Sequence, residues 1–305
     1  MRQYVLGRIV QLLVAMVGIS VITFALTYVL GDPLTVLLPL DAPRETRETY
    51  RHEMGLDQPL PVQYGRFASG AVRGDFGDSY LIHKPAMRLV LERFPATLQL
   101  TLCGLAFAVA LAVPLGVLGA YRRNSPLDSL ATSLAVAGQA IPIYWLGLML
   151  IIVFAVQLKW LPVSGYGGPE NLILPTIALG SFLAPITMRL VRSSMIDVLS
   201  QDYVRTARTK GLAERVVLLR HAFKNAALPV VSVLGLQFGQ LLGGAVVTET
   251  VFAWPGVASF TVDSISNGDY PVVQAAVILL AVAISLVNLA VDLALGFLDP
   301  RIQAA

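Results

Sequence analysis

The chain has 305 residues, of which 56% are hydrophobic and 13% carry a charged side chain. Soluble proteins contain roughly 45–50% apolar residues and about 25% charged ones. A single soluble core could not bury so much apolar surface, so the composition excludes a soluble enzyme, a nucleic-acid-binding domain and a disordered tail. The net charge of +3 and the mean hydropathy of +0.71 fit a membrane chain, in which basic residues set the orientation.

Six stretches without Asp, Glu, Lys or Arg are long enough to cross the hydrocarbon core, which takes about 20 apolar residues in a helix. A β-barrel would show segments of about ten alternating residues, which the sequence lacks. The first stretch is longer than the apolar part of a signal peptide, so we expect it to remain as an uncleaved helix. We therefore predict an all-α membrane protein with six transmembrane helices, at residues 9–31, 94–121, 129–158, 171–188, 225–248 and 270–291.

The basic residues predict the orientation, because Lys and Arg gather in the cytoplasmic connections of membrane proteins. With a cytoplasmic N-terminus, the connections and ends on that side hold thirteen of them, whereas Lys159 is alone in a short connection on the other side. The long segment 32–93 holds another eight, but long loops cross the membrane largely regardless of charge. We expect both termini in the cytoplasm.

These spans divide the chain into residues 1–31 with the first helix, an outer segment at 32–93, and a core at 94–305 with a cytoplasmic loop at 189–224. The outer segment is rich in proline and mixed in charge, and a short helix is expected near residues 45–54. Segments longer than about 12–15 residues without regular structure are usually functional or disordered. A surface that meets a soluble protein is therefore expected there.

The inner loop carries eight basic and three acidic side chains. Asp202 can cap a short helix, Gly211 can end it in a left-handed conformation, and a second helix can run to a break at Leu228-Pro229. Such a loop could be an anchor on anionic lipid headgroups. It could equally be a docking element for a cytoplasmic protein, and its spacing leaves both interpretations open.

The sequence from Asp202 to Leu212, Asp-Tyr-Val-Arg-Thr-Ala-Arg-Thr-Lys-Gly-Leu, resembles the cytoplasmic loop of ATP-binding-cassette importer permeases. It is similar to the branch that handles dipeptides, oligopeptides and nickel complexes. The general permease motif Glu-Ala-Ala-x3-Gly aligns at Arg205, Thr206, Ala207 and Gly211, so its glutamate is absent, as is typical of that branch. The resemblance covers essentially the whole chain, with further motifs at residues 55–64, 94–98, 141–147, 220–229, 249–257 and 299–302.

The resemblance implies the type I importer permease fold in a prokaryotic inner membrane. It implies a heterodimer with a homologous second permease, two cytoplasmic ATPases and an extracytoplasmic binding protein, with membrane lipid around the helices and no nucleic acid. ATP and Mg would be bound by the ATPases, and this chain would hold no cofactor, metal or catalytic residue. Contact with the ATPases would fall to Asp202, Tyr203, Arg205, Thr206, Ala207, Arg208, Lys210, Gly211, Leu228 and Pro229.

Within this loop, Ala207 is expected to present a small face to an ATPase, while Arg205, Arg208 and Lys210 pair with acids at the rim of the ATPase groove. The sequence contains no Gly-x4-Gly-Lys-[Ser/Thr] phosphate loop and no Gly-x-Ser-x-Gly hydrolase motif. His52-Glu53 also lacks the second histidine of a His-Glu-x-x-His zinc site. The chain is therefore not expected to be an enzyme.

Three polar residues lie in or beside the predicted spans, where a charge costs about 2.5–3.5 kcal/mol on insertion scales. Glu249, Asn288 and Asp292 could contact the translocation path or the partner permease. Alternatively, Glu249 is an acid at the membrane interface and Asp292 makes a polar contact between helices. Both interpretations stay open.

The function expected from the sequence is that of an importer permease for dipeptides or oligopeptides. A nickel-chelate importer is the alternative, because Gly165-Tyr166-Gly167-Gly168 after Trp160-Leu161-Pro162 resembles nickel-handling relatives. A channel or secondary transporter is less favoured. Secondary transporters commonly show internal repeats and charged sites at the membrane midplane, whereas the second to fifth spans are free of charge and show no repeat.

Overall fold

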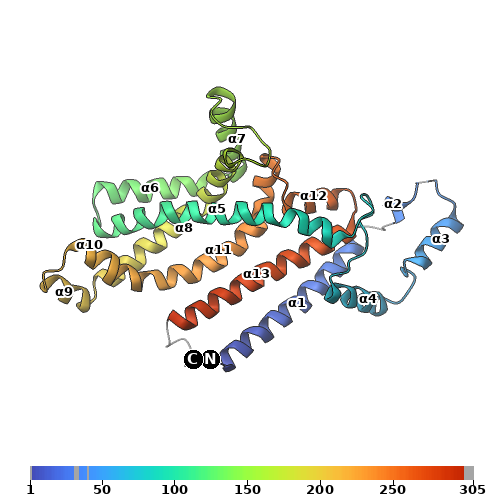
Figure 1. Cartoon of the computed structure of the whole chain (residues 1–305), viewed down its shortest axis with the longest axis horizontal. Coiled ribbons are helices and arrows are strands. Elements are labelled where there is room, and N and C mark those ends of the chain that lie inside the picture. The colour runs from blue at the N-terminus through green and yellow to red at the C-terminus, as the bar shows by residue number, and fades with distance from the viewer. Residues whose placement is uncertain (1, 31–33, 40, 299–305) are drawn as a thin grey trace. The chain divides into compact units, whose positions relative to one another are not determined.

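The structure is a computed structural model that describes residues 2–30, 34–39 and 41–298 (Figure 1). Within the described ranges the chain consists of helices joined by turns and loops, and the one β contact there is an isolated bridge between Asp78 and Pro85. The all-α prediction is confirmed. The helices are α1 (Arg2–Leu30), α2 (Leu34–Leu37), α3 (Arg44–Glu53), α4 (Leu60–Arg73), α5 (Ala86–Tyr121), α6 (Pro126–Ala140), α7 (Ile143–Leu150), η1 (Ile151–Gln157), α8 (Pro169–Leu199), α9 (Asp202–Thr209), α10 (Glu214–Val216), η2 (Val217–Ala222), α11 (Phe223–Val251), α12 (Val257–Ser266) and α13 (Tyr270–Leu298).

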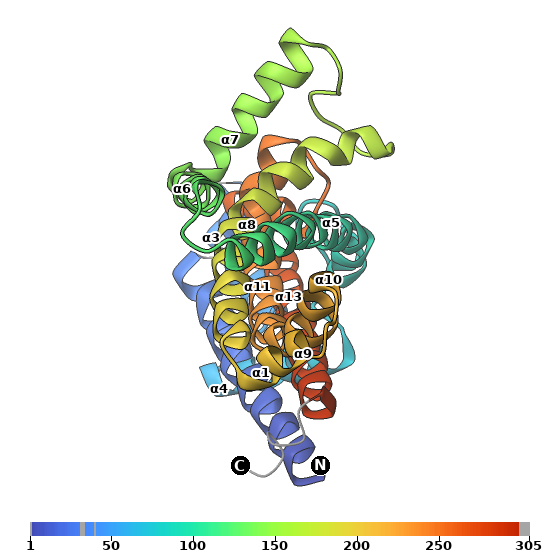
Figure 2. The same cartoon turned by 90° about the vertical axis from the view of Figure 1, so that its left-hand side faces the viewer.

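Among the described residues, five continuous helical stretches are long and apolar enough to span a membrane. They are Leu6–Leu26, Ala86–Tyr121, Pro169–Leu199, Glu214–Val251 and Tyr270–Ala294. The predicted span at 129–158 is not one straight helix, because α6 and the helix formed by α7 and η1 meet at a bend of 100° (Figure 2). The predicted number of six is reached when this bent pair is counted as one broken span.

The bend falls at Ile141 and Pro142, whose ψ angles of 119° and 135° are extended rather than helical. Proline has no amide hydrogen to donate, and its ring disfavours the helical conformation in the residue before it. The α6 helix therefore ends at Ala140, and α7 begins at Ile143. The signal was present in the sequence, since Pro142 lies in the middle of the uncharged run.

Other prolines remain inside helices. Pro175 and Pro185 lie within α8, and Pro229 lies within α11. The predicted break at Leu228-Pro229 is therefore wrong: α11 continues through this pair to Val251. Helices in membranes tolerate proline because neighbouring helices and local adjustments satisfy the freed backbone groups.

Several of the predicted spans lie within longer helices, and α5 and α8 are two examples. The α5 helix begins at Ala86 rather than at 94, and α8 continues past Met188 to Leu199, so Arg189 belongs to α8 rather than to a loop. The short outer helix expected near residues 45–54 is confirmed as α3, Arg44–Glu53. The motif at 299–302, which was part of the resemblance, lies outside the described residues.

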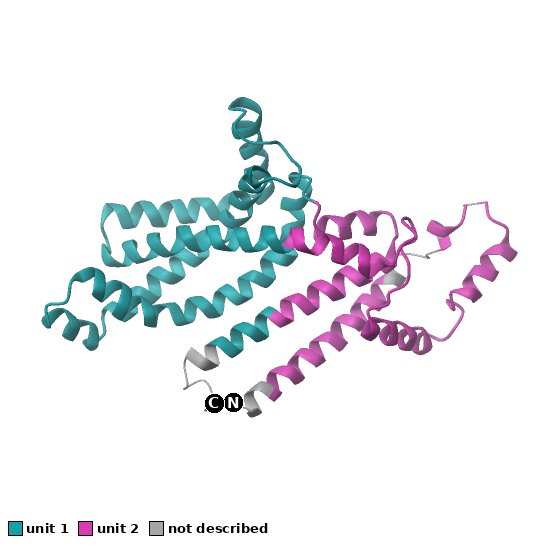
Figure 3. Ribbon diagram, in the orientation of Figure 1, with its two compact units in different colours: residues 1, 98–254, 287–305 teal, residues 2–97, 255–286 magenta. Residues whose placement is uncertain are grey.

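The chain forms two compact units, shown in different colours in Figure 3. The first unit holds residues 98–254 and the chain from 287 onward, and the second holds residues 2–97 and 255–286. The long helices α5 and α13 contribute to both units. The outer segment predicted at 32–93 is thus part of a larger unit that also includes α12 and the first half of α13.

In the first unit, α8 packs against α5, α6, α7 and α11. Its buried side chains contribute to three hydrophobic clusters along its length. These clusters are Leu174 and Ala178 with Ala155 and Phe252; Met188 with Ala112, Ala131 and Ala135; and Val191 and Met195 with Val117, Ala120, Ala222, Ala226 and Val230. The α8 helix therefore links the other helices of this unit.

The contact between α5 and α8 depends on small residues. Buried small residues recur every four positions along α5, at Gly104, Ala108, Ala112, Gly116 and Ala120. A Cβ atom added to Gly116 would lie 2.8 Å from the carbonyl oxygen of Met188 and 2.8 Å from Cβ of Val191. One added to Gly180 would lie 2.6 Å from the carbonyl oxygen of Gly104. Small residues spaced by four let two membrane helices approach backbone to backbone.

In the second unit, Asp269 joins segments that are far apart in the sequence. Its buried carboxylate accepts hydrogen bonds from the Ser79 hydroxyl and from the Tyr80 amide, the latter at 3.0 Å. The Val257 amide donates to the Thr97 hydroxyl at 2.8 Å. These bonds attach the segment before α5 to the start of α13, and α5 itself to the start of α12.

Glycine-to-alanine substitutions at Gly116 in α5 and at Gly18 in α1 should affect the stability of the protein differently. Gly116→Ala should lower the thermal unfolding midpoint of the permease in detergent, because overpacking typically costs about 1–3 kcal/mol. Gly18→Ala in α1 should leave the midpoint unchanged or raise it, because no atom lies within 4 Å of its added Cβ and alanine is the better helix former by about 1 kcal/mol. Equal midpoints for the two variants would contradict close packing at Gly116.

Candidate functional site

The residues of the predicted inner loop lie in the α9–η2 segment, which we define as residues 202–222. It contains α9, a turn, α10 and η2, and it leads directly into α11. Within the first unit, it lies at the same end as the turn between α5 and α6 (Figure 1). The short helix predicted before Gly211 is present as α9. The second helix, predicted to run to Leu228-Pro229, begins with α10 and continues through η2 and α11 to Val251.

One face of α9 is apolar and packs within the segment. Val204 and Ala207 are 0% and 7% exposed and form a small cluster with Val217 of η2, to which Val198 and Leu199 of α8 add. The expectation that Ala207 presents a face to a partner protein is therefore wrong. Its methyl group packs α9 against η2, and a larger side chain there would disrupt the segment itself.

Gly211 ends α9 as predicted, with φ of +76°. Its amide donates to the carbonyl oxygen of Arg208 at 2.9 Å, and the amide of Leu212 donates to that of Ala207 at 3.4 Å. This pair of bonds is the Schellman arrangement, in which a left-handed residue follows the helix end. At the other end, the cap position belongs to Gln201, while the predicted cap Asp202 is the first residue of the helix.

Polar contacts hold the two halves of the segment together. Arg208 Nη2 lies 2.7 Å from Glu214 Oε1, and this hydrogen bond raises the pKa of the Arg208 guanidinium. Asn225 Nδ2 donates to the Tyr203 hydroxyl at 2.7 Å, which connects α9 to α11. Arg208 therefore has an acidic partner within this chain, in contrast to the expected pairing with an external acid.

The remaining loop residues point outward. Asp202, Arg205, Thr206 and Lys210 are exposed, and Arg205 lies 3.8 Å from Asp202 in an exposed pair. The segment thus has an apolar inner side and a charged outer side. Leu228 and Pro229 lie within α11 rather than in the loop.

The three polar residues considered for the translocation path lie in two places. Glu249 is fully buried near the end of α11, whereas Asn288 and Asp292 are half-buried on α13. Val291 of α13 packs against Gly235 of α11, fourteen residues before Glu249. At 1.5 Å per residue this separation is about 21 Å along the helix. These residues therefore do not form one site.

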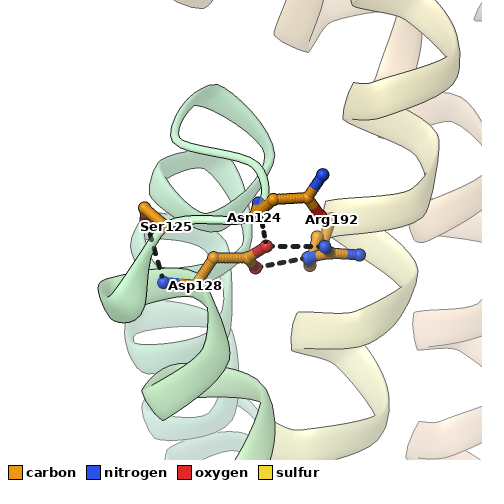
Figure 4. A network of polar contacts seen from close by, with 4 residues as sticks. All are labelled: Asn124, Ser125, Asp128 and Arg192. Atoms are coloured by element: carbon orange, nitrogen blue, oxygen red, sulfur yellow. Dashed lines mark hydrogen bonds and ion pairs between the residues drawn. The ribbon is translucent and has the colours of Figure 1, made fainter.

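A second polar cluster, which sequence reasoning missed, lies at the turn between α5 and α6 (Figure 4). Arg192 of α8 donates from Nε to Asp128 Oδ1 at 2.6 Å and from Nη2 to Oδ2 at 2.7 Å. The Asn124 amide also donates to Asp128 Oδ2 at 2.9 Å, and the Asp128 amide donates to Ser125 Oγ at 3.3 Å. The sequence Ser-Pro-x-Asp at 125–128 is typical of a helix start. Nothing in it indicates that the Asp128 carboxylate binds Arg192, which is 64 residues further along the chain.

Titratable groups of the second unit also make specific contacts. On the exposed surface, His52 Nδ1 lies 2.6 Å from Asp57 Oδ2, and this hydrogen bond raises the pKa of His52 and lowers that of Asp57. Burial raises the pKa of Tyr80 to about 12, and the nearby Asp269 adds to the effect. Among the residues that the structure describes, no group of three His, Cys, Asp or Glu side chains has the arrangement of a metal site.

Two family matches cover most of the sequence. Residues 112–304 match the family described as "Binding-protein-dependent transport system inner membrane component", and residues 1–101 match its N-terminal counterpart, "Binding-prot-dependent transport system membrane comp, N-term". The chain belongs to this family. It is a multi-pass inner-membrane permease subunit of an ATP-binding-cassette importer, as the sequence resemblance implied. The family is one of membrane permeases rather than of enzymes.

Among its relatives are glutathione transport system permease proteins. GsiC of Escherichia coli (strain K12) is 41% identical over 304 residues, and GsiC of Salmonella paratyphi A is 40% identical, each match covering 99% of both chains. Two solved transporters share the fold. One is the MetNI methionine ABC transporter in inward-facing conformations, with a TM-score of 0.58, 18% identity and coverage of 70% of this chain and 97% of that chain. The other is an amino acid ABC transporter with histidines, with a TM-score of 0.50, 16% identity and coverage of 70% and 94%.

The cap of α9 gives a test of the α9–η2 segment. The added Cβ in Gly211→Val would meet no atom within 4 Å, so its cost is purely that of the backbone, about 1–2 kcal/mol for a left-handed residue. We expect faster amide hydrogen exchange across α9 in this variant. Gly211→Asn is the control, because asparagine tolerates the left-handed conformation. Exchange rates that are the same in both variants and the wild type would show that the cap does not hold α9.

Proposed function

We propose that this permease forms half of the translocation path of an ATP-driven importer for short peptides, with glutathione as the first substrate to test. The observation that carries the proposal is the 41% identity over 99% of both chains to glutathione transport system permease proteins. Glutathione is a tripeptide, so it falls within the peptide class that the sequence suggested. The second half of the path would come from a homologous permease.

The orientation proposed from the basic residues places both termini in the cytoplasm. The α9–η2 segment and the turn after α5, with Arg122 and Arg123, would then face the cytoplasm as well. This placement is supported by the charge difference, because Lys159 alone stands in the short connections on the other side. The charged outer side of α9 would be available to the ATPases, which would hold ATP and Mg.

Contact with the ATPases requires that the α9–η2 segment be rigid. An ATPase that pushes on α9 moves the membrane helices only if the segment keeps its shape. The cluster of Val204, Ala207 and Val217 and the Arg208–Glu214 pair tie α9 to α10 and η2. The exposed Asp202, Arg205, Thr206 and Lys210 would form the contact with the ATPase.

The substrate test uses the permease reconstituted in vesicles with its second permease, both ATPases and the binding protein. We expect ATP-dependent accumulation of labelled glutathione or of a labelled dipeptide such as Ala-Ala, and none without ATP. The permease incorporated alone should transport neither, because half of the path is missing.

Two outcomes would count against this proposal. Accumulation of a nickel–histidine complex, with no uptake of glutathione or dipeptide, would favour the nickel-chelate alternative. ATP-independent transport by the permease alone would favour a channel or secondary transporter. An inactive binding protein is recognised separately, by its failure to bind the labelled substrate before reconstitution.

The outer helices α3 and α4 would contact the binding protein. Arg47 and Arg66 lie on these helices, which carry mostly exposed or half-buried side chains. The sequence has one cysteine, Cys103, which is replaced by alanine for this test. In that background, a cysteine at Arg47 or Arg66 with a bifunctional cross-linker should trap the binding protein loaded with substrate. A cysteine at Leu127 in α6, on the expected opposite side of the membrane, is the control. Cross-links from the control alone would contradict this contact.

A further inference from the structure

The Asp128–Arg192 pair joins three helices at one end of the first unit. Asp128 lies in the first turn of α6, and Arg192 lies two turns before the end of α8. The α5 helix is equally close, since a Cβ added to Gly119 would lie 3.1 Å from Asp128 Oδ1 and 3.5 Å from Arg192 Cδ. Figure 4 shows the carboxylate and the guanidinium facing each other between the α5–α6 turn and α8.

The geometry of the pair fixes a specific alignment. The carboxylate of Asp128 is 4% exposed and accepts three hydrogen bonds, two from the guanidinium and one from the Asn124 amide. A bidentate guanidinium–carboxylate pair restricts both distance and orientation. Two apolar side chains would pack the same space without the cost of removing charges from water. Packing alone therefore does not explain why charges occupy this position.

The surroundings connect the pair to the α9–η2 segment. Val191, directly before Arg192, and Met195, about one turn after it, pack with Val117 and Ala120 of α5 and with Ala222 of η2. Tyr121, the last residue of α5, lies close enough to Arg208 of α9 to contribute to its raised pKa. The α9–η2 segment, the end of α8 and the α5–α6 turn are thus adjacent within one unit.

We propose that Arg192 and Asp128 are positioning residues that clamp the α5–α6 turn to α8, so that both move as one body when the α9–η2 segment is displaced. This inference rests on the proposed function, in which the ATPases act on that segment. Without the clamp, displacement of α9 would still move α8 and α11, but the α5–α6 turn would be held to α8 by apolar packing alone and would follow it incompletely. ATP hydrolysis would then continue with less transport.

The distance test needs no knowledge of the substrate. Spin labels at Leu127→Cys and Ser200→Cys, both exposed positions, report the separation of the α6 start and the α8 end in a Cys103→Ala background. In the reconstituted complex we expect one narrow distance distribution, the same without nucleotide and with ATP and vanadate. Adding Arg192→Gln should broaden the distribution or make it depend on nucleotide. A distance distribution that changes with nucleotide while Arg192 and Asp128 are both present would overturn the proposal.

The functional test compares uptake with hydrolysis. For Arg192→Gln we expect uptake per ATP hydrolysed to fall tenfold or more, while the amount of assembled complex stays within about twofold of the wild type. Arg192→Lys, which keeps the charge but not the bidentate contact, should have more uptake per ATP hydrolysed than Arg192→Gln and less than the wild type. It also replaces Arg192→Gln if that variant does not accumulate. Arg122→Gln, which removes an exposed charge at the same turn, is the matched control and should keep the wild-type ratio.

Uptake and hydrolysis that fall in the same proportion, or a wild-type ratio in both Arg192 variants, would reduce the pair to a purely structural contact and refute the clamp. Failure of the wild-type complex to take up any peptide would refute the proposed function instead. In that case the distance distributions still decide whether the α5–α6 turn and α8 move together.

Discussion

Inside a bilayer no water is available to pair with a backbone amide or carbonyl, so each must find its partner within the protein. The helices of this permease follow from that constraint, and so do their interruptions. At Pro142 one helix ends and another begins at a bend of 100°. Pro175, Pro185 and Pro229 stay inside α8 and α11, which lie among other helices that can compensate for a missing hydrogen bond.

The same lack of water removes most of the hydrophobic force between helices, which leaves close contact and polar pairing to hold them together. The α8 helix uses both. It approaches α5 at Gly116 and Gly180, where only a hydrogen fits, and it reaches α11 through the hydrogen bond from Thr187 to Gln237. Near its end, Arg192 binds Asp128. A helix held on several sides in this way is suited to carry a displacement from one end of the unit into the membrane.

The α9–η2 segment divides its side chains between two tasks. Apolar side chains and one internal ion pair give it a fixed shape, and the exposed polar ones remain available to a partner. This division explains why the general permease motif can lose its glutamate here without losing the segment. The small residue at Ala207 is needed for packing against Val217, and the glycine at 211 is needed for the turn. Neither of these needs involves the position occupied by Arg205.

The sequence by itself determined what depends on neighbouring residues: the membrane class, five of the spans, the short helix at residues 44–53 and the left-handed end of α9 at Gly211. Hydropathy and local backbone preferences act over a few residues, so they can be read along the chain. The tertiary structure alone decided that Ala207 faces inward and that α11 passes through Pro229. It also brought Asp128 to Arg192, 64 residues apart, and Asp269 to Ser79, 190 residues apart. Such contacts depend on which helix faces come together, and no local pattern in the sequence specifies that.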